Sequence, residues 1–119
     1  MDRKLLGRWG EEKAAEYLKK KHYTIIGMNY SCRFGEIDII AEKDGFVVFA
    51  EVKLRKSADF AQAREFVDAR KRERLTAAAQ LWLAGNACAL QPRFDVIEVY
   101  APKGADSESI QINHIENAF

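Results

Sequence analysis

The spacing of apolar positions predicts two helices, each with one buried face. In residues 7–21, small and apolar side chains recur every three or four positions among Glu and Lys residues. Residues 67–84 repeat this pattern, and Gly85 follows as a helix stop signal. The two stripes consist of Leu6, Gly10, Ala14, Ala15 and Leu18 in the first helix and of Lys71, Leu75, Ala78, Ala79 and Trp82 in the second. Both segments are therefore predicted to be amphipathic helices.

Runs of β-branched and aromatic residues predict five strands. They cover residues 23–30, 36–42, 46–54, 93–100 and 110–115. The segments between them are a turn at 31–35, a polar stretch without a clear period at 57–64 and a loop at 102–109. The resulting order, α-β-β-β-α-β-β, predicts a mixed α/β protein. A length of 119 residues predicts one domain, spanning residues 1–119.

The second and third strands are expected to form a hairpin that brings two acids together. Asp44 and Gly45 separate the two runs, and this dipeptide is a strong signal for a two-residue turn. With that turn, Asp38 directly faces Glu51 across the hairpin. A three-residue loop would instead set Asp38 opposite Ala50 and end the direct pairing. The prediction of an acidic pair therefore depends on the register of the hairpin.

An opposed pair of carboxylates beside apolar residues predicts a cation site. Like charges on directly opposed strand positions repel, and hard oxygen ligands suit Mg²⁺ or Mn²⁺. One pair further along, Glu36 faces Lys53, so that all four polar side chains project from one face. The Lys53 ammonium could then orient a water molecule or stabilise charge on a phosphate. The alternative is that Asp38 and Glu51 form ordinary salt bridges with Lys53 and Arg55.

Composition narrows the class of protein without indicating a function. Apolar residues make up 48% and charged residues 31% of the chain, which is typical of a globular protein rather than a disordered one. The longest apolar stretch, residues 46–50, is far too short to span a bilayer. The two cysteines, Cys32 and Cys88, form neither a disulfide framework nor a CxxC pair. We therefore expect a soluble, cytoplasmic protein that does not bind membranes.

A net charge of +1 means that only a local patch could indicate nucleic-acid binding. Between residues 53 and 74, eight Lys and Arg residues outnumber four acids. Four of these basic residues are predicted to contact phosphates, namely Arg55, Lys56, Lys71 and Arg74. The alternative is a solvated helix face, because several of these charges have ordinary i,i+4 spacing. Lys71 lies on the apolar stripe of its helix, so its ammonium is expected near the face of the sheet that carries the acids.

The motifs of the chain carry a family resemblance. The sequence GEID at residues 35–38, followed by EVK at 51–53, resembles the PD-(D/E)xK core of the restriction-endonuclease-like superfamily. Over nearly its full length the chain resembles the YraN family of small bacterial proteins. The motifs that carry this resemblance are GRWGEE at 7–12, NY at 29–30, RFGEID at 33–38, EVKLR at 51–55, Val67 with Lys71, RFDV at 93–96 and NAF at 117–119.

The resemblance implies a fold and a role for each site residue. The fold would be restriction-endonuclease-like, with a mixed central sheet and flanking helices. Asp38 and Glu51 would be the metal-binding acids, assisted by the Val52 carbonyl. Glu11 matches the helix-borne acid that completes the site in resolvase-like members, and Lys53 matches the catalytic lysine. The chain departs from the family pattern at two positions outside the metal chemistry, Leu54 and Ala61.

The implied function is a metal-dependent endonuclease that uses Mg²⁺ or Mn²⁺ to hydrolyse phosphodiester bonds in DNA. The family is related in fold to Holliday-junction resolvases, so branched or damaged DNA is an expected substrate. A chain of 119 residues offers little surface to wrap a duplex, and a junction-cutting enzyme of this size is expected to be a homodimer. The alternative is a non-catalytic nuclease-fold module that binds DNA or a partner protein.

Overall fold

The structure is a computed structural model that describes residues 2–56 and 68–119. Its helices and strands, in chain order, are α1 (Arg3–Lys20), β1 (Thr24–Cys32), β2 (Gly35–Lys43), β3 (Phe46–Arg55), α2 (Ala69–Gly85), β4 (Gln91–Tyr100), the 3-10 helix η3 (Gly104–Asp106) and β5 (Gln111–Ile115). The strands form one sheet in the order β1-β2-β3-β4-β5. Only β3 and β4 pair in parallel, so the predicted mixed α/β order is confirmed.

Both helices begin where an aspartate caps them. The Asp2 side chain accepts the N–H of Leu5 at 2.8 Å, which explains why α1 begins earlier than the predicted residue 7. The Asp68 side chain caps α2 in the same way, so this helix begins just after it. The predicted irregular segment 57–64 and the predicted first helical residue, Val67, lie outside the described residues. Within the described ranges, neither helix is long and apolar enough to cross a membrane.

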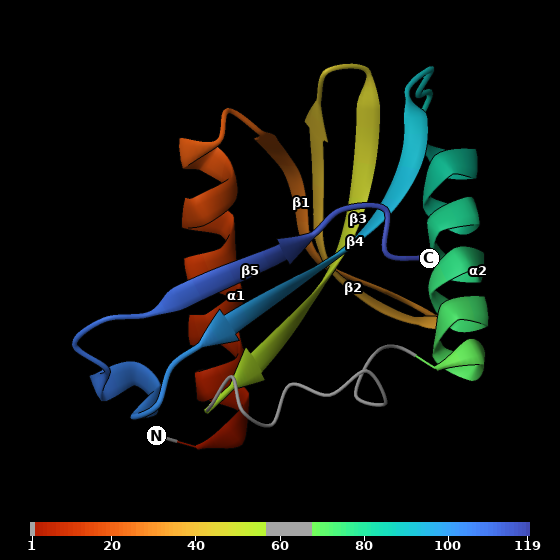
Figure 1. Ribbon diagram of the computed structural model, residues 1–119. Coiled ribbons are helices and arrows are strands. Elements are labelled where there is room, and N and C mark those ends of the chain that lie inside the picture. The colour runs from red at the N-terminus through yellow and green to blue at the C-terminus, as the bar shows by residue number, and fades with distance from the viewer. Residues whose placement is uncertain (1, 57–67) are drawn as a thin grey trace.

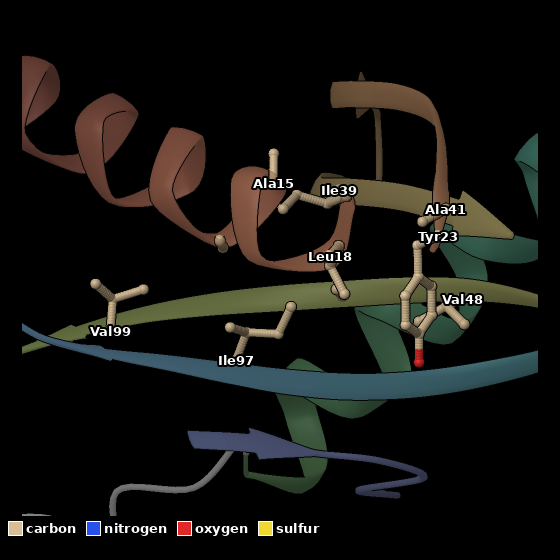
Figure 2. Packing of buried hydrophobic residues seen from close by; sticks show 10 residues of the cluster. Ala15, Leu18, Tyr23, Ile39, Ala41, Val48, Ile97 and Val99 are labelled. Carbon is tan, nitrogen blue, oxygen red and sulfur yellow. The ribbon is translucent and has the colours of Figure 1, made fainter. Parts of the chain in front are cut away.

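The two helices cover opposite faces of the sheet and bury two separate apolar clusters (Figure 1). On one face, Ala15 and Leu18 of α1 pack toward buried side chains of β2, β3 and β4 (Figure 2). On the other face, Leu75 and Ala78 of α2 pack with residues such as Phe49. All these α1 and α2 residues belong to the stripes predicted from the sequence, so the predicted helix faces are confirmed.

The β2–β3 hairpin has the predicted two-residue turn. Asp44 and Gly45 have φ angles of 51° and 85°, and both angles lie in the left-handed region that a tight hairpin turn of this type requires. The ladder of paired residues then runs from Lys43↔Phe46 to Ile39↔Ala50. This register contradicts the alternative in which Asp38 would face Ala50.

The regular pairing of β2 with β3 ends just before the predicted acidic pair. Ile39 packs in the cluster under α1, whereas Ile37 packs in the cluster under α2, although a regular strand would place both on one face. The pleat of β2 is therefore broken at Asp38. The predicted pairs Asp38–Glu51 and Glu36–Lys53 are not part of the ladder.

Beyond this break, β2 and β3 diverge. The far end of the β1–β2 hairpin lies beside the first turns of α2, while β3 continues alongside β4 (Figure 1). The predicted acids consequently lie where β2 and β3 separate, beyond the pair Ile39↔Ala50, and not on a flat sheet surface. We call this place the fork. This fork is open enough for a carboxylate from α1 to join them.

Candidate metal centre

Three carboxylates from two elements converge at the fork. Oxygen atoms of Glu11 on α1 and of Glu36 and Asp38 on β2 all lie within 4.8 Å of one another. Glu11 lies next to the buried residues of its helix, and its side chain is 14% exposed. The fold thus brings the helix-borne acid to the strand acids across a distance of 27 residues in sequence.

Asp38 is the acid at the centre of this group. Its Oδ2 atom accepts the backbone N–H of Val52 at 2.8 Å, so its carboxylate takes the place of a strand-to-strand hydrogen bond. Burial, followed by repulsion from Glu51, raises the pKa of Asp38 to about 8, and Glu11 and Glu36 add to this effect. Asp38 is therefore a carboxyl group whose ionised form lacks a compensating positive charge.

Glu11 provides a test of whether a cation fits. Its buried Oε1 atom accepts no hydrogen bond from any described residue, and the nearest basic atom, Arg8 Nη1, lies 3.9 Å away. Burial raises the pKa of Glu11, although interaction with the Asn29 side chain opposes the rise. Asn29 itself has a buried Oδ1 atom that is also without a donor within the described part of the chain. Unsatisfied buried oxygens beside clustered acids are the donor set that a hard divalent cation binds.

Glu51 has a different environment from the three clustered acids. Its side chain is 9% exposed, and its Oε1 atom lies 3.4 Å from the ammonium of Lys53. Lys71 of α2 forms a close ion pair with the same oxygen atom. Burial and the adjacent Lys71 lower the pKa of Lys53, whereas the pKa of Lys71 is raised because the pull of Glu51 outweighs burial. The alternative of ordinary salt bridges thus describes Glu51 but not Asp38.

A cavity of about 230 Å³ opens beside these groups. It lies between the end of the β1–β2 hairpin and the first turns of α2. Its lining combines the acids with basic and apolar side chains: Phe34, Gly35, Glu36, Glu51, Lys71, Arg74 and Leu75. Two of the four residues predicted to contact DNA, Lys71 and Arg74, therefore border the cavity that adjoins the acids.

The other two predicted DNA contacts lie elsewhere. Lys56 is exposed at the end of β3. The Arg55 side chain is only 15% exposed, and its Nε atom donates to the buried Glu98 carboxylate at 3.3 Å. Tyr100 and Asn113 donate to the other oxygen atom of Glu98. Arg55 is therefore engaged in a buried polar network between β3, β4 and β5.

Glu36 is the member of the acidic group to which the sequence analysis gave no metal-binding role. It was expected on the same face as Asp38, because the two residues are two positions apart on one strand, and opposite Lys53. The break in β2 instead leaves Glu36 beside Glu11 and Asp38. The two-residue spacing of Glu36 and Asp38 was the available signal in the sequence. The path of β2 is what brings both side chains to Glu11.

A second buried polar group lies under α1 and is centred on Asp95. Asp95 is fully buried and accepts two hydrogen bonds from Arg93, which lies two positions before it on β4. The backbone N–H of Asn117 also donates to it at 3.0 Å. The Nε2 atom of His114 lies 2.6 Å from Asp95 Oδ2, and its Nδ1 atom lies 3.3 Å from the Tyr17 hydroxyl. Tyr17, Asp95 and His114 lie far apart in sequence, so no local spacing could have indicated that they meet.

Comparison with known proteins indicates a family. The model described as "Uncharacterised protein family UPF0102" matches residues 10–99 of the chain. A UPF0102 protein of Caldanaerobacter subterraneus is 44% identical over 121 residues, which cover 100% of this chain and 98% of the relative. A UPF0102 protein of Syntrophomonas wolfei is 43% identical, covering 96% of each chain. One from Flavobacterium psychrophilum is 39% identical, covering 96% of this chain and 92% of the relative.

Proposed function

This chain belongs to the UPF0102 family, and on that premise we propose that it is a metal-dependent endonuclease that hydrolyses phosphodiester bonds in DNA. The membership agrees with the resemblance to the YraN family drawn from the motifs. The names of the relatives state no reaction, so the proposal is argued from the residues of this chain.

The observation that carries the proposal is the convergence of Glu11, Glu36 and Asp38 around an unsatisfied buried oxygen of Glu11. Folding this group without a cation is costly, because burial and mutual repulsion both oppose ionisation of Asp38. A site retained for stability alone would pair its acids with donors. We propose that Asp38, Glu11 and Glu36 hold Mg²⁺ or Mn²⁺, with Glu51 and the Val52 carbonyl as the adjoining oxygen ligands.

The lysines supply the second part of the proposed chemistry. A divalent cation in such a site polarises a phosphoryl oxygen and lowers the pKa of a nearby water. Lys53 lies beside Glu51 on β3, where its ammonium can orient a nucleophile or offset negative charge on the phosphate. Burial lowers its pKa, which makes proton exchange with the reacting groups easier than for an exposed lysine.

The element order and the position of the acids support a restriction-endonuclease-like fold. That superfamily is expected to have a mixed sheet with helices on both faces. One acid lies before the turn of a hairpin, and an acid and a lysine lie after the turn, as in β2 and β3 of this chain. Its relationship to Holliday-junction resolvases makes branched DNA the substrate that we propose to test first. Two active sites are needed to cut a junction symmetrically, so the proposed active form is a homodimer.

The test is cleavage of a four-way junction, a flap and a linear duplex in Mg²⁺ or Mn²⁺. We expect Asp38→Asn, Glu51→Gln and Lys53→Met each to reduce the cleavage rate by at least about a hundredfold. The first two remove proposed metal ligands, and the third removes the ammonium that acts on the nucleophile or the phosphate. Glu11→Gln has a matched control in Glu12→Gln, since Glu12 is the adjacent, exposed acid on the same helix. Equal activity of Asp38→Asn and wild type would refute the proposal.

The alternative, a non-catalytic module that binds DNA or a partner protein, predicts a different result. Such a protein would bind DNA equally well with or without Asp38 and Glu51, and metal would not change its stability. We expect instead that Mg²⁺ or Mn²⁺ raises the melting temperature of wild type but not of the double variant Asp38→Asn/Glu51→Gln. DNA binding without a metal effect and without cleavage would favour the module.

A further inference from the structure

One carboxylate oxygen in the fork is bound by two ammonium groups at once. The Oε1 atom of Glu51 contacts Lys53 of β3 and Lys71 of α2. The Glu51 side chain is 9% exposed, so the carboxylate of this double ion pair is shielded from solvent, whereas the Lys53 and Lys71 side chains are partly exposed. Two positive charges on one oxygen atom repel each other, and a third cation at the same carboxylate would be repelled by both.

The two lysines differ in how they reach Glu51. Lys53 lies two residues away on the same strand, so the strand itself fixes its position beside Glu51. Lys71 approaches from the first turn of α2, where its backbone N–H is bound to the Asp68 cap at 2.9 Å. Its side chain is 35% exposed and borders the cavity. Lys71 can therefore turn away from Glu51 without any change in the backbone.

The cavity offers Lys71 a second partner. Its lining contains Arg74, one helical turn further along α2, and the apolar side chains of Phe34 and Leu75. A phosphate group entering beside the acids would meet the ammonium of Lys71 once that ammonium no longer contacts Glu51. A basic side chain with two possible anionic partners is suited to change partners when a cation arrives.

We infer that Lys71 is an exchangeable counter-ion that competes with the divalent cation for Glu51 and is released by it toward the substrate phosphate in the cavity. This inference rests on the proposed metal site. Before the cation binds, the ionised acids Glu11, Glu36, Asp38 and Glu51 outnumber Lys53 and Lys71 by two charges, so the metal-free group has a net negative charge that attracts a divalent cation. Lys71 is thus a positioning residue for Glu51 before the metal binds and a substrate contact afterwards.

The first test measures Mn²⁺ affinity by calorimetry in the absence of DNA. We expect Lys71→Met to bind Mn²⁺ about tenfold more tightly than wild type, because a positive charge next to the cation has been removed. Lys71→Arg keeps the charge and should bind like wild type. Arg70→Met, on the adjacent exposed residue of the same helix, controls for loss of one positive charge. A general loss of structure could only weaken binding, so tighter binding has no structural explanation.

The second test measures binding of a short DNA duplex with and without Ca²⁺, a hard divalent cation that takes oxygen ligands as Mg²⁺ does. We expect Lys71→Met to match wild type without metal, because Lys71 is then held by Glu51. With Ca²⁺ the variant should bind roughly fivefold more weakly, since wild type has gained one phosphate contact. Lys71→Gln gives the same comparison if the Met variant does not fold.

The outcomes separate this inference from the proposed function. If wild type and Asp38→Asn both fail to bind Mn²⁺, the metal site itself is wrong. If wild type binds Mn²⁺ and Asp38→Asn does not, but Lys71→Met binds no more tightly than wild type, only the exchange by Lys71 is overturned. An equal loss of DNA affinity with and without Ca²⁺ would also overturn it, because Lys71 would then be a constant phosphate contact.

Discussion

Two aspartates of the central strands have opposite environments. Asp95, under α1, accepts hydrogen bonds from Arg93, from the backbone of Asn117 and from His114. Asp38, in the fork near α2, accepts the N–H of Val52 and is surrounded by further acids. Asp95 is fully buried and Asp38 is half-buried. Both residues precede an apolar run of a central strand, so this sequence context does not distinguish them.

The pKa values record this difference. Burial alone would raise the pKa of Asp95, but the donors around it outweigh burial and lower the pKa. At Asp38, burial and neighbouring acids act together and raise the pKa to about 8. An acid whose charge is compensated by donors has a structural role. An acid whose charge is not compensated indicates a binding site for a cation.

The largest expected effect is at Asp95. Asp95→Asn should lower the free energy of unfolding by about 3 kcal/mol, because the largely buried Arg93 side chain would lose the carboxylate that it contacts at 2.8 Å and keep the exposed Glu116 carboxylate at 3.6 Å. Urea unfolding monitored by circular dichroism measures the change, with the exposed Asp106→Asn as the matched control. A loss below about 1 kcal/mol would mean that Asp95 and Asp38 do not differ in the way described.

The same substitution at Asp38 should act in the opposite direction. Asp38→Asn keeps an acceptor for the Val52 N–H and removes a charge that the metal-free protein cannot compensate. We expect metal-free Asp38→Asn to be more stable than wild type by about 1 kcal/mol or more at pH 8. Asp44→Asn, at the turn of the same hairpin, is the control. Destabilisation by Asp38→Asn would contradict an uncompensated carboxylate.

The pH dependence of stability sharpens the comparison. The folded pKa of Asp38 lies above its unfolded value, so metal-free stability should fall as pH rises from about 4 to about 8. The folded pKa of Asp95 is depressed, so its contribution is present above about pH 4 and is lost as pH falls below that value. Unfolding of wild type and of each Asn variant across pH 3–9 would measure both windows. If wild type and Asp38→Asn differed in the pH dependence of unfolding only below about pH 4, the raised pKa of Asp38 would be contradicted.

The smallest effect is expected at Glu36, the exposed member of the acidic group. Glu36→Gln should change the free energy of unfolding by less than about 0.5 kcal/mol, as is usual for an exposed position. It should nevertheless weaken Mn²⁺ binding several-fold, because one of three clustered carboxylates is lost. Calorimetry on Glu36→Gln and on the exposed Glu108→Gln compares an acid inside the group with one outside it. If Glu36→Gln and Glu108→Gln bound Mn²⁺ with equal affinity, Glu36 would not be a metal ligand.

Much of the fold could be predicted from local pattern. The stripes of α1 and α2, the five strands and the two-residue turn at Asp44 and Gly45 each depend on residues that are neighbours in sequence. The error at the start of α1 came from the Asp2 cap, which lies outside the apolar period. Asp38, Glu51 and Lys53 could be singled out because the hairpin fixes their separation over 13 to 15 residues of chain.

The sequence by itself determined the elements, the hairpin register up to Ile39 and the identity of the acids and lysines near the fork. Only the tertiary structure decided how these groups are partnered. The break at Asp38, the meeting of Glu11 with Glu36, the approach of Lys71 to Glu51 and the burial of His114 against Asp95 depend on how helices and strands pack. Charges interact through space and through the local dielectric, so spacing along the chain cannot reveal which buried charge is compensated.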